Sequence, residues 1–117
     1  MPNGIAIKED IQESVSQRVN VSCTANAWAK AYTYTAPVSG FYALYGKSVW
    51  SASFPIGANI TTHSTAPTGY DDIAVSASGV NEVSAVVYLT AGTNIYFYGM
   101  WQNDGINAFN VNIKLIP

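Results

Sequence analysis

A single cysteine and a single histidine are the side chains best suited to chemistry in this 117-residue chain. A thiol nucleophile needs a neighbouring base that lowers its pKa, but Cys23 and His63 are far apart in the sequence. A zinc site needs several such ligands at short spacing. The pattern predicts a buried structural cysteine, a histidine in a surface loop, and no catalytic residue, metal site or cofactor.

Neighbouring carboxylates suggest a second kind of chemistry. Asp71 and Asp72 follow one another, and Glu82 comes next along the chain. Such oxygen ligands bind Ca²⁺, although calcium sites gather more carboxylates and carbonyls at fixed loop spacing. Adjacent residues of a strand point to opposite faces, so the two aspartates do not form the carboxylate pair of a glycosidase. The spacing favours a solvated turn.

Aromatic residues beside amides are the candidates for ligand binding. Trp101 is followed by Gln102, Asn103 and Asp104, and Tyr70 lies in another loop. Flat aromatic faces edged by amides and carboxylates suit carbohydrate rings, so Trp28, Trp50 and Trp101, with Tyr70, are candidates for a sugar-stacking platform. The preferred site is Trp101 with its three polar successors and Tyr70. The alternative is that all three tryptophans lie in the core or in a subunit interface, where amphipathic rings are common.

The composition is typical of a small domain that associates with other subunits. Only 10% of the residues are charged and 13% are aromatic, whereas about 25% charged residues are usual in soluble domains. A monomer of this size has little interior room for three Trp, eight Tyr and four Phe. We therefore expect an oligomer.

Charge and hydropathy argue against two classes of partner. The formal net charge is −2 and the five basic residues are scattered, so no basic stripe can neutralise several phosphates of a nucleic acid. The apolar runs are far shorter than the ~20 residues of a membrane helix, and no signal peptide pattern is present. We expect no nucleic-acid binding, no membrane insertion, and synthesis in the cytoplasm.

Residues 1–18 differ from the rest because they hold five of the twelve charged residues. Apolar residues recur there at a spacing of four, which is compatible with one stripe on a short helix. An extended segment that becomes ordered only on a partner is equally compatible. The apolar residues of this docking arm are Ile5, Ile7, Ile11 and Val15.

From residue 19 onward, stretches rich in Val, Ile, Thr and aromatic residues alternate with Pro and Gly turns. No helical pattern lies between them, which predicts an all-β antiparallel sandwich. The expected strands are residues 19–25, 29–35, 40–51, 58–62, 73–78, 83–89, 93–102 and 108–116. Eight strands suit a jelly-roll β-sandwich, so we expect one jelly-roll domain over residues 19–117.

The strand expected at residues 93–102 is apolar on both faces. Its two faces are Ile95, Phe97 and Trp101 on one side and Tyr96, Tyr98 and Met100 on the other. A strand buried on both sides of a two-sheet sandwich needs a second cover, and the simplest cover is the same strand of a symmetry mate. This pattern predicts that the strand is central to an interface.

Three segments, taken in order, carry a family resemblance. They are YTAPVSGFY at 34–42, where Pro37 ends a strand, VYLTAGTNIYF at 87–97, and AFNVNI at 108–113. Together they resemble the trimeric jelly rolls related to complement C1q and tumour necrosis factor, which recur among bacteriophage fibre and virion proteins. Asn94 departs from the acidic residue usual in the second segment.

The resemblance implies a non-catalytic homotrimer whose subunits pack aromatic faces around a threefold axis. It implies that Tyr96, Tyr98 and Met100, with Tyr42, form the trimer interface. The bacteriophage branch fits a chain without a collagen stalk, which implies a virion protein: a capsid decoration, a head fibre or a fibre tip. Its arm would dock on a capsid or tail protein, with a host surface glycan as a further partner. The alternative is a carbohydrate-binding module that uses the loop at 101–107.

Overall fold

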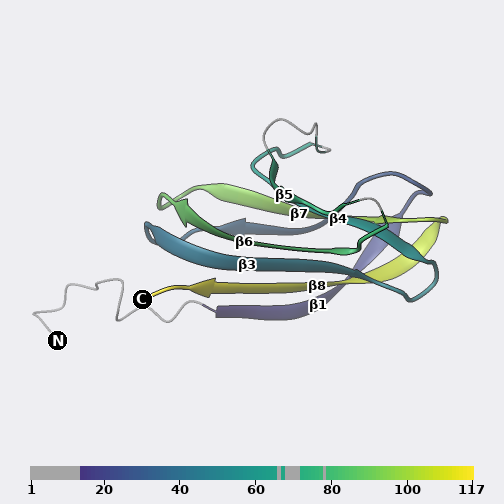
Figure 1. The fold of residues 1–117 in the computed structure, drawn as a ribbon, viewed down its shortest axis with the longest axis horizontal. Coiled ribbons are helices and arrows are strands. Elements are labelled where there is room, and N and C mark those ends of the chain that lie inside the picture. The colour runs from purple at the N-terminus through teal and green to yellow at the C-terminus, as the bar shows by residue number, and fades with distance from the viewer. Residues whose placement is uncertain (1–13, 66, 68–71, 78) are drawn as a thin grey trace, which may run out of the picture.

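The computed structural model describes residues 14–65, 67, 72–77 and 79–117, and the regular structure in these residues is entirely β-strand. The strands, labelled in Figure 1, are β1 Ser14–Cys23, β2 Ala29–Thr35, β3 Gly40–Val49, β4 Pro55–Thr61, β5 Asp72–Val75, β6 Glu82–Leu89, β7 Asn94–Trp101 and β8 Gly105–Leu115. The described residues contain no helix with the length and apolarity needed to cross a membrane.

The strands form two four-stranded sheets, with the orders β1-β8-β3-β6 and β2-β7-β4-β5. Every pair of neighbouring strands is antiparallel, and Figure 1 shows the two sheets packed as layers. Successive strands mostly alternate between the sheets, as they do in a jelly roll. The predicted all-β, antiparallel jelly-roll sandwich is confirmed.

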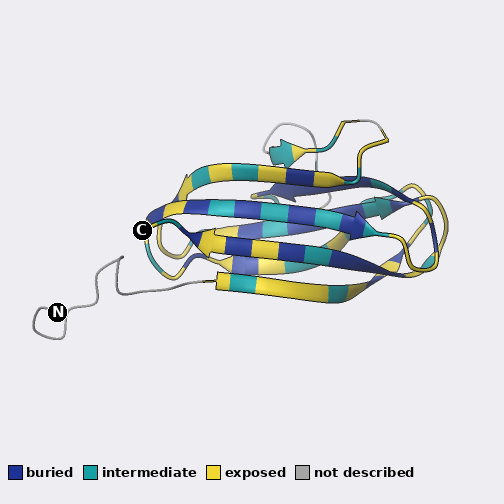
Figure 2. Cartoon of the chain, turned by 60° about the horizontal axis from the view of Figure 1, so that its bottom comes forward, coloured by how far each residue is buried: buried dark blue, intermediate teal, exposed yellow. Residues whose placement is uncertain are grey.

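Large apolar side chains fill the space between the sheets. Burial alternates residue by residue along β3 and along β8 from Phe109 to Leu115, as Figure 2 shows, because successive side chains of a strand point to opposite faces. Trp101, Tyr42, Phe97 and Phe109 are the largest fully buried side chains. The rings of Phe97 and Phe109 come from opposite sheets and meet edge to face, with centroids 6.4 Å apart, so ring contacts join the two sheets.

Two strand glycines make room for these rings. A Cβ added at Gly99 would lie 2.6 Å from Ser48 Oγ and would also overlap the ring of Trp101. A Cβ added at Gly46 would lie 2.8 Å from the ring of Phe109. A side chain at either position would therefore push an aromatic ring out of the core.

The N-terminal part of the sheet begins earlier than expected. β1 starts at Ser14 in the described part of the chain, and Val15 pairs with Ile113 of β8. Residues 14–18 are therefore extended and belong to the sheet, because each of them faces a residue of β8. The other apolar residues of the expected docking arm lie outside the described residues; they are Ile5, Ile7 and Ile11.

The outer face of β7 is partly covered from within the same chain. Tyr98 is 3% exposed, and its hydroxyl donates a hydrogen bond to the carbonyl oxygen of Thr65 at 2.6 Å. Tyr96 and Met100, on the same face, are half-buried. The connection after β4 thus supplies part of the cover that was expected from a symmetry mate. A period-two pattern of apolar residues does not predict such a contact, because it joins residues far apart in the chain.

Candidate functional site

Trp101 lies in the core and not at the surface where the sequence suggested a ligand site. Its side chain is 0% exposed, and its Nε1 donates a hydrogen bond to the carbonyl oxygen of Val49 at 3.0 Å. A ring enclosed on all sides offers no face for a ligand to stack on. The hydrogen bond satisfies the indole N–H, as expected for a buried tryptophan.

The residues after Trp101 form an exposed turn. Gln102, Asn103 and Asp104 all lie at the surface. The Oδ1 of Asp104 accepts a hydrogen bond from the backbone N–H of Ala25 at 2.7 Å, which ties the β7–β8 turn to the β1–β2 turn. Tyr70, the other expected ligand contact, lies outside the described residues. Of the four expected residues that the structure describes, Trp101 is enclosed in the core and the other three lie at the surface.

The residues expected at a threefold axis divide into two groups. Tyr42 is 0% exposed, and its hydroxyl donates to the carbonyl oxygen of Val38 at 2.6 Å, while Tyr98 is covered as described above. Tyr96 and Met100 keep part of their surface. Of these four residues, Tyr96 and Met100 are the ones whose side chains could touch another subunit.

The two residues considered for nucleophile chemistry occupy different elements. Cys23, at the end of β1, is a free and buried thiol whose Sγ lies 3.6 Å from Asn107 Nδ2, which confirms its structural placement. His63 is partly exposed in the connection after β4. In the described part of the chain, no three His, Cys, Asp or Glu side chains come together as a metal site requires.

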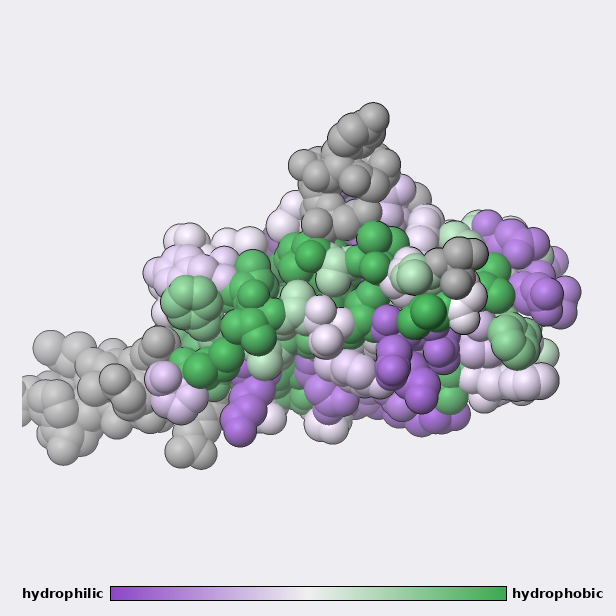
Figure 3. Space-filling model, in the orientation of Figure 1, coloured by the Kyte–Doolittle hydropathy of each residue, from purple (hydrophilic) through white to green (hydrophobic). Residues whose placement is uncertain are grey.

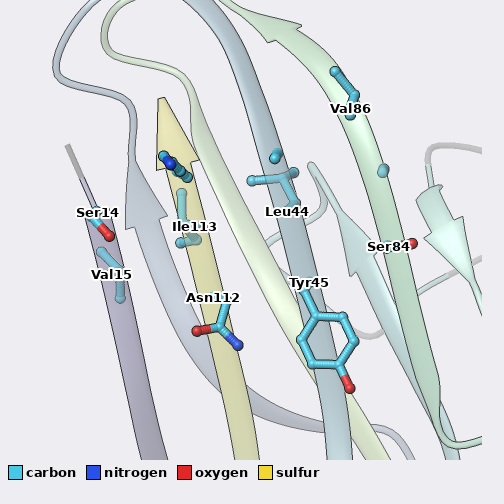
Figure 4. A pocket seen from close by; sticks show the side chains of 11 residues that line it. Ser14, Val15, Leu44, Tyr45, Ser84, Val86, Asn112 and Ile113 are labelled. Atoms are coloured by element: carbon cyan, nitrogen blue, oxygen red, sulfur yellow. The ribbon is translucent and has the colours of Figure 1, made fainter. Parts of the chain in front are cut away.

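A shallow hollow, here called the sheet-face groove, lies on the outer face of the β1-β8-β3-β6 sheet. Its volume is about 630 Å³ and all four strands line it; Figure 4 shows the arrangement. The hollow forms because small residues, Ala43 and Ser84, lie among larger ones, Tyr45 and Val86. Ala43 is the cross-strand neighbour of Val86 on one side and of Lys114 on the other.

The groove combines an apolar floor with polar groups at its sides. The hydroxyl of Tyr45 donates to Glu82 Oε2 at 2.6 Å. Burial of the hydroxyl raises the pKa of Tyr45 to about 12, helped by this hydrogen bond and by the negative charge of Glu82. Asn112 and Lys114 add an amide and an ammonium group. This arrangement is suited to holding a partner surface.

An exposed apolar surface adjoins the groove on β3 and β6. Its members, Val86, Tyr88 and Phe41, are 67%, 54% and 50% exposed, and we call them the β6 apolar surface. Phe41 and Tyr88 are cross-strand partners whose ring centroids are 5.3 Å apart. Figure 3 shows apolar side chains gathered over this part of the molecule.

The β6 apolar surface was not among the expected sites, although the sequence of β6 carries a signal for it. In β6 the inward positions Val83 and Leu89 are buried, yet the outward positions Val86 and Tyr88 are also apolar. A strand that is apolar on both faces needs cover on both. β6 meets this condition as β7 does, because Val86 and Tyr88 lie on its outward face.

Comparisons with known proteins give likenesses to solved structures at low identity. No protein-family model matches the chain, and no curated protein does. The pre-peptidase C-terminal domain of a Bacillus anthracis collagenase is similar at 10% identity and a TM-score of 0.49, with 89% of this chain and 90% of that chain covered.

Two further likenesses are weaker in TM-score. A family 35 carbohydrate binding module from Clostridium thermocellum is 17% identical with a TM-score of 0.39, covering 91% of this chain and 92% of that one. A Bacillus endospore appendage protein, from a family of disulfide-linked pili, is 17% identical with a TM-score of 0.41, covering 97% and 96%. These values are too low to assign a family, a ligand or a partner to the chain.

Proposed function

We propose that this chain is a non-catalytic structural and binding protein that assembles into a homotrimer on a bacteriophage particle, as a capsid decoration, head fibre or fibre tip. The β6 apolar surface carries the proposal. Val86, Tyr88 and Phe41 each keep half or more of their side-chain surface in a single subunit. Monomeric proteins rarely leave such contiguous apolar surface uncovered.

The position of β6 at the edge of its sheet supports self-association. β6 pairs with β3 on one side, and the sheet ends at β6 on the other. Natural edge strands are usually protected by lysine, proline or a bulge. The sequence of β6, EVSAVVYL, has none of these residues, and its eight paired positions with β3 show no register shift. Such an edge is stable in solution when another chain covers it.

Burial of this surface would add a favourable free energy to assembly. Full burial of one large apolar side chain contributes about 1.5–3 kcal/mol, and Val86, Tyr88 and Phe41 each have half or more of their surface left to bury. The sheet-face groove beside them could receive side chains of the neighbouring subunit. Association costs about 4–15 kcal/mol, so these three side chains are one part of a larger contact between subunits, as expected of a closed symmetric assembly.

The attachment to a particle is assigned to residues 1–13, which precede β1. Ile5, Ile7 and Ile11 give this segment an apolar character, and β1 begins at Ser14 on the wall of the sheet-face groove. A capsid or tail protein is the proposed partner. The bacteriophage setting is supported by the resemblance of the three sequence segments, and the structure adds the jelly-roll topology.

Light scattering coupled to size-exclusion chromatography tests the assembly. We expect a mass three times that of the 12.5 kDa subunit, and a stable monomer at micromolar concentration would contradict the proposal. A truncation that removes residues 1–13 tests attachment, because it leaves β1 intact. The truncated protein should keep its mass and lose binding to its particle.

A further inference from the structure

A second hollow lies beyond the end of β3, beside two exposed aromatic rings. Trp50 is 64% exposed and Phe54 is 47% exposed. Their ring centroids are 5.4 Å apart and the ring planes are inclined at 64°. The hollow has a volume of about 330 Å³, and its lining includes both rings together with Lys47 and Asn81.

The loop that carries these rings is held rigidly by a buried amide. Asn107 is 1% exposed, and its Oδ1 accepts hydrogen bonds from the backbone N–H groups of Ala52 and Ser53, both at 2.8 Å. The carbonyl oxygen of Phe54 accepts a third bond, from the backbone N–H of Gln102 at 3.0 Å. A ring presented on a fixed backbone loses little conformational entropy when a ligand stacks on it.

Polar groups stand at the border of the rings. Asn81 Nδ2 donates to the carbonyl oxygen of Ser48 at 2.7 Å, which orients the amide and leaves Oδ1 as an acceptor. Lys47, near the end of β3, contributes an ammonium group with three N–H donors. Aromatic walls with a few oriented polar groups are the usual composition of a small-ligand site.

We propose that this hollow binds a sugar ring of a neutral oligosaccharide. One face of a pyranose consists of C–H groups that can pack on the face of Trp50, where the π-electrons are negative. Its equatorial hydroxyls would then lie at the edge of the ring, in reach of Asn81 and Lys47. No carboxylate lines the hollow in the described residues, and such a group would otherwise favour a basic ligand.

This site differs from the one that the sequence favoured. Trp50 is one of the three tryptophans that the sequence offers for sugar stacking, but the favoured loop follows Trp101, which is buried, whereas Trp50 is 64% exposed. The inference does not depend on the homotrimer, because Trp50 and Phe54 are separate from the β6 apolar surface. Assembly and sugar binding can therefore fail independently.

Isothermal titration calorimetry with chitopentaose, cellopentaose, maltopentaose and mannopentaose tests the proposal. We expect at least one of these probes to bind the full chain. Trp50→Ala should weaken that binding by at least about tenfold, equivalent to about 1.4 kcal/mol. Binding should also blue-shift the tryptophan fluorescence of the wild type, because Trp50 would leave water.

Val75→Ala is the control, since it removes an exposed apolar side chain that belongs neither to the hollow nor to the β6 apolar surface, and it should leave sugar binding unchanged. The proposal is overturned if none of the four probes binds, or if Trp50→Ala binds as tightly as the wild type. It is also overturned if Trp50→Ala changes the mass of the assembly, because the rings would then be an interface between copies.

Discussion

Asn59 is a fully buried polar side chain whose environment does not satisfy it. It is 0% exposed on β4, and neither its Oδ1 nor its Nδ2 has a hydrogen-bond partner among the residues that the structure describes. Its cross-strand neighbours are Tyr98 on one side and Val75 on the other. A buried amide without partners costs about 1–3 kcal/mol, so Asn59 destabilises the isolated subunit.

Asn59→Leu should therefore raise the free energy of unfolding by about 1–3 kcal/mol, because leucine has a similar volume and no polar atoms to satisfy. Urea denaturation at neutral pH measures the change. Asn59→Ala is the control, since it removes the amide but leaves a cavity, and it should gain less than Asn59→Leu. A loss of stability in Asn59→Leu would show that the amide has a partner in the assembled protein.

Ionisation of Tyr45, which lines the sheet-face groove, makes the free energy of unfolding depend on pH in the alkaline range. Its pKa is raised from 10.0 to about 12 in the folded chain, so the folded state holds the hydroxyl proton more tightly than the unfolded state does. The resulting stabilisation is fully present below pH 10 and is lost as the pH rises toward about 12.

Tyr45→Phe should lower stability at neutral pH, because it removes the hydrogen bond to Glu82, and should flatten the decline between pH 10 and about 12. Chemical denaturation at a series of pH values across this window tests both effects. Burial also raises the pKa of Tyr98, so some decline persists in the variant. An unchanged slope in Tyr45→Phe would be inconsistent with this assignment.

At the scale of the element, the packing of β7 against the core requires a glycine at position 99. Gly99→Ala should lower the free energy of unfolding by about 1–3 kcal/mol, since the new methyl group would meet Ser48 and the fixed ring of Trp101. Gly57→Ala is a graded comparison, because its Cβ would lie 3.1 Å from the ring of Trp28, which is only half-buried and can move. Thermal unfolding should show the larger loss for Gly99→Ala.

The strands themselves were readable from the sequence. The expected ranges agree with β2, β3, β6, β7 and β8 to within a few residues, because alternating apolar and polar residues, with Pro and Gly between them, fix both the strand and its inward face. The first expected strand begins at residue 19, whereas β1 begins at Ser14. The difference arises because charged residues at the start of β1 are typical of an arm outside the core. Arg18 is nevertheless accommodated opposite Asn110, on the exposed side of the sheet.

The candidate surfaces were less predictable than the strands. Periodicity tells which residues share a face, and it assigned Trp101 correctly to the face of Ile95 and Phe97. In a strand that is apolar on both faces, such as β7, periodicity does not tell which face turns inward, or which loop returns to cover a ring such as Tyr98. Both depend on contacts between residues far apart in the chain. The sequence therefore does not predict that Trp50 is exposed and Trp101 is buried.

At the scale of the whole molecule, one sheet has an outer face that is polar at one edge and apolar at the other. The outer face of β1-β8-β3-β6 is polar toward β1, where Ser16, Arg18 and Asn20 are exposed, and apolar toward β6. A symmetric assembly that buries the β6 side leaves the polar side in water. Because only 10% of the residues are charged, we expect this uneven distribution to decide which face is buried in the proposed assembly.

Val86→Arg tests that distribution directly. The side chain of Val86 points outward and is 67% exposed, so the fold should tolerate arginine, with a stability change of about 0.5 kcal/mol or less in the isolated subunit. In the assembly the same change would bury three unpaired charges near one another, which proteins avoid at a cost of several kcal/mol. Light scattering should therefore show the variant as a folded monomer.

Ile106→Arg provides the control, because Ile106 is an outward aliphatic residue of the same sheet with a matched exposure of 63%. It faces Ser22 of β1, away from the β6 edge, and its replacement should leave the assembly intact. If both variants dissociate, charge alone weakens the assembly and β6 has no special part in it. If neither dissociates, the subunits meet elsewhere, and the exposed surface of Tyr96 and Met100 on β7 becomes the place to substitute next.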